Sequence, residues 1–157
     1  MLKKIFPFLG LALIFFASCR KEDAIITAST ELRFSTDTVY LDTVFETIGS
    51  STYELKVYND SKESISIPRI RLADPASPYR LNINGTATNQ LDNVEILPED
   101  SIYIFVEVNA GEILQQTEVL VEDQIIFELS GISQSVELVT LAKEAIFHFP
   151  NRFIVIG

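Results

Sequence analysis

Few residues in this chain of 157 are able to carry covalent or metal chemistry, because it has one cysteine, Cys19, and one histidine, His148. A Ser-His-acid nucleophile needs a histidine, and His148 lies between Phe147 and Phe149, a setting more typical of packing or of a surface than of catalysis. A structural zinc site needs several Cys or His ligands, which the composition does not supply. We therefore expect no catalytic residue, no metal site and no cofactor.

Carboxylates are the abundant reactive group, since Asp and Glu together number 22. Two acidic groups surround expected turns: Asp92, Glu95, Glu99 and Asp100, and then Glu118, Glu122 and Asp123. Neither group has the alternating oxygen ligands and central glycine of an EF-hand loop. Solvated, charged loops therefore explain these residues better than cation binding does.

Cys19 follows an apolar segment that extends from Ile5 to Ala17, behind two lysines. Its length of about 13 residues suits the core of a signal peptide and falls short of the ~20 that span a bilayer. The two small residues before Cys19 match the box of bacterial lipoproteins, in which the thiol is acylated, although Phe16 stands where that box usually has leucine. An ordinary signal peptide, or an anchor left uncut, would need no cysteine there. We expect residues 1–18 to be removed and Cys19 to carry acyl chains, such as palmitate, that anchor the protein in a membrane.

The residues after Cys19 resemble an export signal. Lys21, Glu22 and Asp23 match the lysine and acidic residues behind the lipidated cysteine of Bacteroidetes-type surface lipoproteins. Arg20 is not the aspartate that retains lipoproteins in the inner membrane of many Gram-negative bacteria. The resemblance implies a lipid-anchored outer-membrane protein at the cell surface. The alternative is a solvated linker on a periplasmic protein.

Composition limits the partners. The formal net charge is −10, and loss of Lys3 and Lys4 with the signal peptide makes it −12. Nucleic acid is not expected as a partner, because neutralising phosphates needs a basic face. A single cysteine forms no intrachain disulfide, so the folded part depends on its core alone. The length leaves room for one domain, which we expect to be a monomer.

Apolar residues alternate with polar ones along most of the chain after the signal peptide, which is the two-residue period of strands. Three stretches have one apolar face: Tyr53, Leu55 and Val57; Tyr79, Leu81 and Ile83; Ile125, Phe127 and Leu129. Between Ser101 and Val108 both faces are apolar, with Tyr103 and Phe105 opposite the aliphatic residues. We expect this stretch to be a central strand covered on both sides, with Phe105 and Val106 buried.

Residues that favour turns separate these stretches at short intervals: Asn59-Asp60-Ser61, Asp74-Pro75, Asn84-Gly85, Pro98-Glu99-Asp100, Glu122-Asp123 and Ser130-Gly131. Many short strands with such turns predict an all-β sandwich or barrel. In the segment from Thr38 to Ile48 the apolar alternation changes face, since Val39 and Val44 differ in parity. Either a bulge or a crossing between sheets near Asp42 and Thr43 explains the change.

The order of strands and turns resembles a Hydin-type immunoglobulin-like domain. The resemblance is carried by the stretches Tyr53–Asp60, Ile65–Ile67, Tyr79–Leu81 and Leu97–Ile102, and it covers roughly Glu31 to Ala145. It implies an immunoglobulin-like antiparallel β-sandwich at 31–145, with a tether at 19–30 and a tail at 146–157. The chain has no Trp and no second Cys, so the Cys-Trp-Cys pin of antibody domains is absent. The resemblance implies a module that binds a partner, acts as a spacer or serves as a scaffold. Domains of this family have no catalytic residues, so it implies none here.

Two further stretches, Phe34–Thr38 and Phe147–Pro150, resemble N-terminal regions of Bacteroidetes-type surface lipoproteins in which such a domain precedes a right-handed β-helix. Three functions remain open. The first is a non-catalytic surface lipoprotein that binds a glycan or a protein, or spaces a partner from the membrane. The second is a truncated anchoring domain of a larger polysaccharide-handling β-helix protein. The third is a periplasmic assembly module.

Three short motifs resemble O-glycosylation acceptors of Bacteroidetes-type exported proteins, with Thr38, Thr43 and Ser101 as the candidate acceptors. Aspartate followed by Thr or Ser is also ordinary turn chemistry. Asn84-Gly85-Thr86 fits the N-glycosylation pattern, but Asn-Gly favours a type I′ hairpin turn, which is the interpretation we adopt.

Mass spectrometry of the mature N-terminus tests the lipid anchor. We expect Cys19 to be the first residue and to carry the added mass of acyl chains, because its thiol is the nucleophile of the box. A mature protein that starts at Met1, or that retains Ser18 before an unmodified cysteine, would contradict this expectation.

Overall fold

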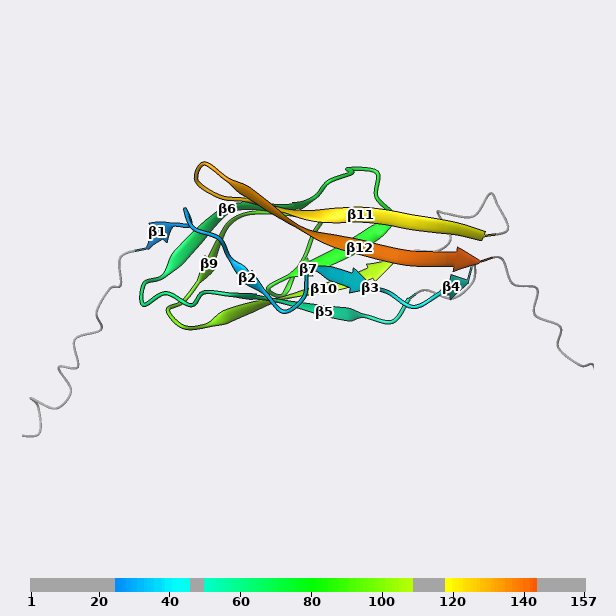
Figure 1. The fold of residues 1–157 in the computed structure, drawn as a ribbon, viewed down its shortest axis with the longest axis horizontal. Coiled ribbons are helices and arrows are strands. Elements are labelled where there is room, and N and C mark those ends of the chain that lie inside the picture. The colour runs from blue at the N-terminus through cyan, green and yellow to red at the C-terminus, as the bar shows by residue number, and fades with distance from the viewer. Residues whose placement is uncertain (1–24, 46–49, 109–117, 144–157) are drawn as a thin grey trace, which may run out of the picture.

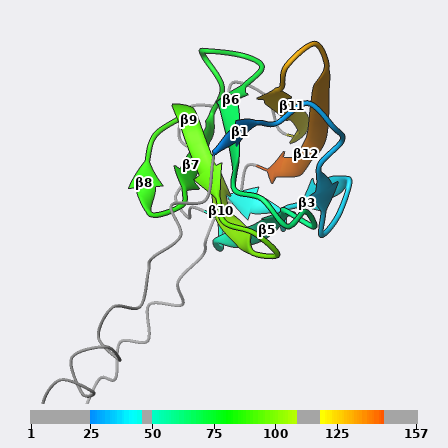
Figure 2. The same ribbon diagram turned by 90° about the vertical axis from the view of Figure 1, so that its left-hand side faces the viewer.

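The computed structural model describes residues 25–45, 50–108 and 118–143. Within these ranges all the regular structure is β, and the strands form two sheets packed face to face (Figure 1). The seven-stranded sheet contains β1 (Ile26–Thr27), β3 (Thr38–Tyr40), β4 (Val44–Phe45), β6 (Ile65–Leu72), β9 (Gln90–Ile96), β11 (Glu118–Glu128) and β12 (Ser133–Lys143). The five-stranded sheet contains β2 (Arg33–Phe34), β5 (Tyr53–Tyr58), β7 (Tyr79–Ile83), β8 (Thr86–Ala87) and β10 (Ser101–Val108). Figure 2 views the two layers from the end at which β1 lies. The expected all-β, immunoglobulin-like sandwich is confirmed.

The core lies between the sheets and is built from the alternating residues of each strand. The three predicted apolar faces all point inward, with Tyr53 only partly buried at the edge of the core. Strand β10 is central in its sheet, since it pairs antiparallel with β5 on one side and with β7 on the other. Its aliphatic residues, Ile102, Ile104, Val106 and Val108, are buried.

The expectation that β10 is covered on both faces is wrong. Val106 is fully buried, but the Phe105 side chain is 37 % exposed and Tyr103 is exposed beside it. The physical reason is that the seven-stranded sheet packs on one face of β10, and no described residue forms a layer over the other face. Alternation fixes which residues share a face of a strand, whereas the packing of the sheets decides which face is covered.

Most predicted turns are confirmed. Asn84 and Gly85 connect β7 to β8 with φ values of 48° and 87°, as a type I′ turn requires. Gly131 adopts φ 88° in the hairpin between β11 and β12. The turn expected at Glu122-Asp123 is wrong, because both residues lie inside β11, and Asp123 instead accepts a hydrogen bond from the Asp74 backbone N–H at 3.3 Å.

The N-terminal segment moves between the sheets earlier than expected. Strand β2 pairs with β5 in one sheet, and β3 pairs in parallel with β12 in the other, so the crossing lies between Phe34 and Thr38 rather than near Asp42. Near Asp42 there is a bulge instead: Tyr40 pairs with Val139 and Val44 with Ala142, which leaves one extra residue on the N-terminal side. The bulge alternative therefore explains the change of apolar parity.

The sandwich also begins before the expected boundary at Glu31. Ile26 and Thr27 pair in parallel with Ile65 and Ser66, and Ala28 is buried in the core. These residues belong to the folded domain and not to the tether. The pairing is mixed, since β1, β3 and β4 join their neighbours in parallel while the other strand pairs are antiparallel.

Asn59 closes the end of the sandwich near β1. Its buried side-chain amide donates to the carbonyl oxygens of Glu63, Ile96 and Leu97 at 2.8, 3.1 and 2.9 Å, and its Oδ1 accepts from Ser61. These bonds join the crossing from β5 to β6 with the crossing from β9 to β10. A single buried asparagine thus connects two of the places at which the chain changes sheet at this end; the third is the segment from β1 to β2.

A matched pair of substitutions on β10 tests this arrangement. Ile104→Ala should lower the free energy of unfolding by about 2–5 kcal/mol, because it leaves a cavity between the sheets. Phe105→Ala should lower it by about 1 kcal/mol or less, since that ring lies on the outer face. Urea unfolding of both variants measures the difference, and equal losses would contradict the assignment of the two faces.

Candidate functional site

Three aromatic side chains gather on the outer face of the five-stranded sheet. Strand β5 supplies Tyr58, and β10 supplies Tyr103 and Phe105, each pointing away from the core because its neighbours in sequence point inward. The strand register places Lys56 opposite Tyr103, and Arg33 of β2 opposite Tyr58. We call these five residues the aromatic face.

The rings are ordered by contact with one another and with cations. Tyr103 and Phe105 are stacked, with ring centroids 6.3 Å apart and planes inclined by 10°. The Lys56 ammonium lies 4.8 Å from the centroid of Tyr103, and the Arg33 guanidinium lies 3.8 Å from that of Tyr58. Cation–π attraction at these distances holds both cations over the rings. The result is a strip of exposed aromatic surface bordered by the side chains of Arg33 and Lys56.

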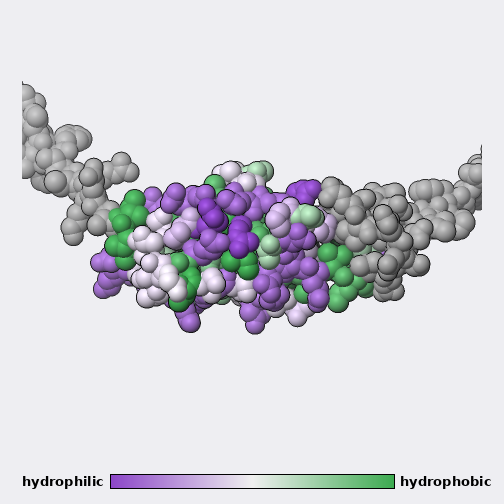
Figure 3. All heavy atoms as spheres, turned by 90° about the horizontal axis from the view of Figure 1, so that it is seen from above, coloured by the Kyte–Doolittle hydropathy of each residue, from purple (hydrophilic) through white to green (hydrophobic). Residues whose placement is uncertain are grey.

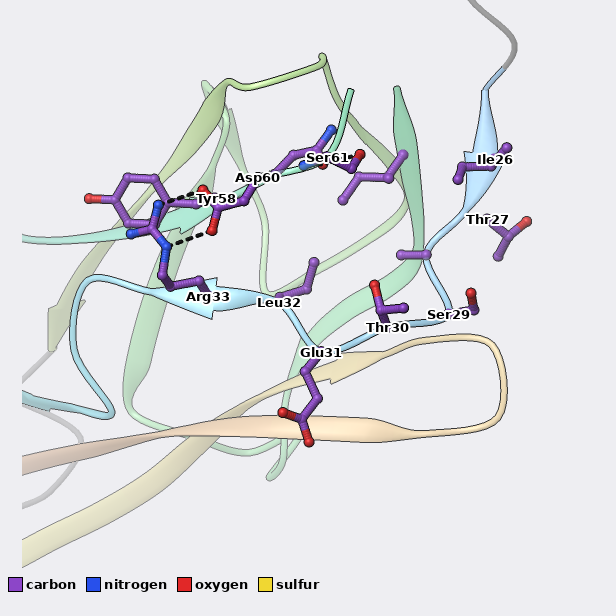
Figure 4. A pocket seen from close by; sticks show the side chains of 13 residues that line it. Ile26, Thr27, Ser29, Thr30, Glu31, Leu32, Arg33, Tyr58, Asp60 and Ser61 are labelled. Carbon is purple, nitrogen blue, oxygen red and sulfur yellow. Dashed lines mark hydrogen bonds and ion pairs between the residues drawn. The ribbon is translucent and has the colours of Figure 1, made fainter. Parts of the chain in front are cut away.

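An ion pair fixes Arg33 in its place. Arg33 Nε donates to Asp60 Oδ2 and Nη2 donates to Asp60 Oδ1, both at 2.6 Å, which is the bidentate geometry of a guanidinium and a carboxylate (Figure 4). Hydrogen bonding from Arg33 lowers the pKa of Asp60 below its ordinary value of 3.8. Asp60 in turn raises the pKa of Arg33. Asp60 thus holds the Arg33 guanidinium in place over the Tyr58 ring.

Polar groups border the rings. Glu54 lies opposite Phe105 on β5 and forms an ion pair of 3.6 Å with Lys56. Asn82 of β7 lies opposite Phe105 on the other side. The Asn82 Oδ1 is buried and has no hydrogen-bond partner among the described residues. Charged groups therefore border the stacked rings on the β5 side, and Asn82, whose Oδ1 is buried, borders them on the β7 side.

A groove of about 280 Å³ lies beside the aromatic face, between the chain from Ile26 to Arg33 and the turn from Tyr58 to Ser61 (Figure 4). Leu32 and Ile65 give it apolar walls. Its charged residues are Glu31 and the pair of Arg33 and Asp60, whose charges satisfy each other. Ser and Thr hydroxyls also line the groove, but no His or Cys is among its lining residues.

The residues predicted from the sequence as sites fall in different places. Cys19, Lys21, Glu22, Asp23 and His148 lie outside the described residues.

The candidate O-glycosylation residues do not come together either. Thr43 is exposed in the bulge, and Thr38 is half-buried in β3 at the edge of the seven-stranded sheet. Ser101 begins β10 in the other sheet, where its backbone N–H donates to the carboxylate of Asp100 at 2.7 Å. Of the three, Thr43 presents the most accessible hydroxyl.

Acidic residues on the seven-stranded sheet are partly paired. Arg69 donates to Asp92 at 2.6 Å and lies 3.9 Å from Glu128, which also accepts from Arg71 at 2.8 Å. Figure 3, which looks down on the molecule from the side of β6, β11 and β12, shows a mainly hydrophilic surface in the middle of this face. In the part of the chain that the structure describes, no three His, Cys, Asp or Glu residues are grouped to hold a metal ion.

A search of the same described ranges finds no helix with the length and apolar character needed to cross a membrane.

The aromatic face itself was not predicted from the sequence. The available signal was the pair of aromatic residues at positions 103 and 105, opposite the aliphatic residues of the same strand. We interpreted that pair as core, because alternation alone does not tell which face of a strand is solvated.

Comparisons with known proteins do not identify a family. No protein-family model and no curated protein matches the chain. Among solved structures it is similar to the CooA pilin subunit of enterotoxigenic Escherichia coli, with 10 % identity, a TM-score of 0.48, and 74 % of this chain and 100 % of the pilin covered. It is similar to the E. coli chaperone DraB, with 14 % identity, a TM-score of 0.45, and 76 % and 57 % covered. A Porphyromonas gingivalis W83 protein of unknown function has 10 % identity and a TM-score of 0.45, with 79 % and 51 % covered, so this chain spans about half of its length.

The pH dependence of Asp60 tests the ion pair that holds Arg33. Because its folded pKa is lowered, the stabilisation is present above the ordinary aspartate pKa and is lost as the pH falls through the lowered value. Carbon-detected NMR titration should give a pKa for Asp60 below 3.8 in the natural chain and close to 3.8 in the Arg33→Gln variant. An identical Asp60 pKa in both proteins would show that Arg33 is not paired in solution.

Proposed function

We propose that this chain is a non-catalytic module, anchored by acylated Cys19 to the outer membrane at the cell surface, whose aromatic face binds a neutral carbohydrate chain. The observation that carries the binding proposal is the stacked, exposed pair Tyr103 and Phe105, with Glu54 and Lys56 beside the rings on β5. The anchor and the location rest on the sequence features of Cys19 and of Lys21 to Asp23.

The shape and chemistry of the aromatic face favour a sugar chain over a small molecule. The rings lie on the open side of a sheet, and a small ligand would be better buried in a concave pocket. The C–H groups on the face of a sugar ring carry partial positive charge and suit the negative face of an aromatic ring. Hydroxyl groups at the edge of the sugar would then meet Lys56 and Glu54, which border the rings.

The charge of the chain favours a neutral carbohydrate. A formal net charge of −10, or −12 without the signal peptide, repels acidic polysaccharides at low ionic strength. The two cations of the aromatic face are each balanced locally, Arg33 by Asp60 and Lys56 by Glu54. Because both cations are paired, the aromatic face does not select an anionic ligand.

The other functions considered from the sequence differ in location or in context. A periplasmic assembly module would have the same fold with Lys21 to Asp23 acting only as linker. An anchoring domain of a larger β-helix protein would also have it, with the carbohydrate chemistry placed in the missing part. Both alternatives leave the aromatic face without a ligand of its own.

Affinity electrophoresis in gels that contain starch, mannan, β-glucan or xylan tests the binding proposal. At least one of these neutral polysaccharides should retard the mature chain. The double variant Tyr103→Ala/Phe105→Ala should weaken that retardation by tenfold or more. It removes the rings on which the sugar stacks and leaves the core intact. Tyr40→Ala is the matched control, since Tyr40 is 71 % exposed on the other sheet. No retardation by any of the four, or equal loss in the control, would contradict the proposal.

A further inference from the structure

Apolar side chains are exposed at the end of the sandwich where β1 begins. They are Ile25, Ile26, Leu97 and Ile132, and each is more than one-third exposed. The first two belong to the start of the described chain, the third to the turn between β9 and β10, and the fourth to the hairpin between β11 and β12. We call these four residues the apolar rim.

The strand register shows that the rim is continuous across the end of the seven-stranded sheet. Ile65 pairs with Ile26 on one side and with Ile96 on the other. One step further toward the end, Ile25 and Leu97 therefore flank Ser64 on opposite sides. Two strand spacings separate them, which is about 10 Å.

The hairpin adds Ile132 to the same end. Its Ser130 backbone N–H donates to the Ala28 carbonyl at 2.8 Å, and Ile132 accepts from the Leu129 backbone N–H at 2.9 Å. These bonds hold the hairpin tip against the chain two residues after Ile26. Figure 3 shows apolar residues gathered at this end of the described surface, the end at which β1 lies.

The distance to the proposed lipid decides what meets the rim. Six residue steps separate Cys19 from Ile25, so the chain between them spans at most about 20 Å. Resting on the proposed acylation of Cys19, we propose that the apolar rim docks on the surface of the membrane that holds the lipid, with its side chains at the boundary of headgroups and acyl chains. Tethering keeps the rim at a high local concentration near that surface, so a weak apolar contact is enough.

Charges at the same end select the kind of lipid. Glu63, Glu99 and Asp100 are exposed in the two turns beside the rim, and Lys62 lies among them. The excess of carboxylates is repelled by anionic headgroups. The surface that fits the rim is therefore composed of zwitterionic lipid, such as phosphatidylcholine in a test vesicle.

The composition allows a direct test, since the chain has no Trp and its one Cys is the attachment point. The mature chain, from Cys19 to Gly157, would be coupled through that thiol to a maleimide lipid in phosphatidylcholine vesicles. Single tryptophans would replace Leu97 or Ile132, and Leu120 as the matched control. Leu120 is 58 % exposed against 55 % for Leu97, but it lies about 30 Å from the hairpin along β11.

Quenching by lipids brominated at known acyl depths is the readout. Tryptophan at positions 97 and 132 should be quenched at least threefold more than tryptophan at position 120, with the strongest effect from the shallowest bromines. Equal quenching at all three positions would overturn the proposal, and stronger quenching in phosphatidylglycerol vesicles would overturn its assignment to zwitterionic lipid. Because the lipid is attached chemically, failure here is distinguishable from a failure of natural acylation, which mass spectrometry of Cys19 reports separately.

Discussion

Strand β10 has one face that closes the core and one face that meets solvent, and its residues alternate between the two. Its even-numbered residues are aliphatic and close the core against the seven-stranded sheet. Its odd-numbered residues include the stacked pair Tyr103 and Phe105, which the same two-residue period must place in solvent. Because β10 pairs with β5 and β7 along most of its length, a one-residue shift in its register would exchange the two sets. The core and the aromatic face are thus two results of one strand alternation.

The end of the sandwich near β1 joins the remaining features. Asn59 bonds the crossing from β5 to β6 to the crossing from β9 to β10, and the neighbouring residues Tyr58 and Asp60 point outward to hold Arg33. The N-terminal segment completes this end by pairing β1 with β6 and β2 with β5. The chain that connects a lipid at Cys19 to the domain would therefore join it at the apolar rim. The aromatic face lies on the adjoining side.

Much of the fold follows from local pattern. Alternation located the buried residues of β5, β7, β10 and β11, and Asn84-Gly85 located a hairpin because few other pairs tolerate two positive φ values. The outer face of β10 was misassigned, since aromatic residues look alike in a core and on a solvated sheet. Glu122 and Asp123 were taken for a turn, although both lie inside β11. Glu122 is exposed, whereas Asp123 is half-buried and accepts hydrogen bonds from the backbone N–H groups of Asp74 and Gln124.

Long-range pairing explains the other differences from expectation. β1 is only two residues long, so its place in the sheet depends on β6 and has no local signal. β6 and β9 both change the parity that faces the core where Pro68 lies opposite Asn93, whose φ is 54°. The aromatic face required knowing which strands are neighbours, because Arg33, Lys56 and Phe105 are distant in sequence. Cys19 and the residues after it were assigned from sequence alone.

If the aromatic face is the binding site, ligand contact is confined to the outer face of the five-stranded sheet. NMR of the chain with ¹³C-labelled Tyr and Phe rings, titrated with the neutral polysaccharide that retards it most in gels, measures where contact occurs. The ring signals of Tyr58, Tyr103 and Phe105 should shift together, while those of exposed Tyr40 and buried Tyr79 should stay unchanged. Shifts at Tyr40 without shifts at Tyr103 and Phe105 would contradict this assignment.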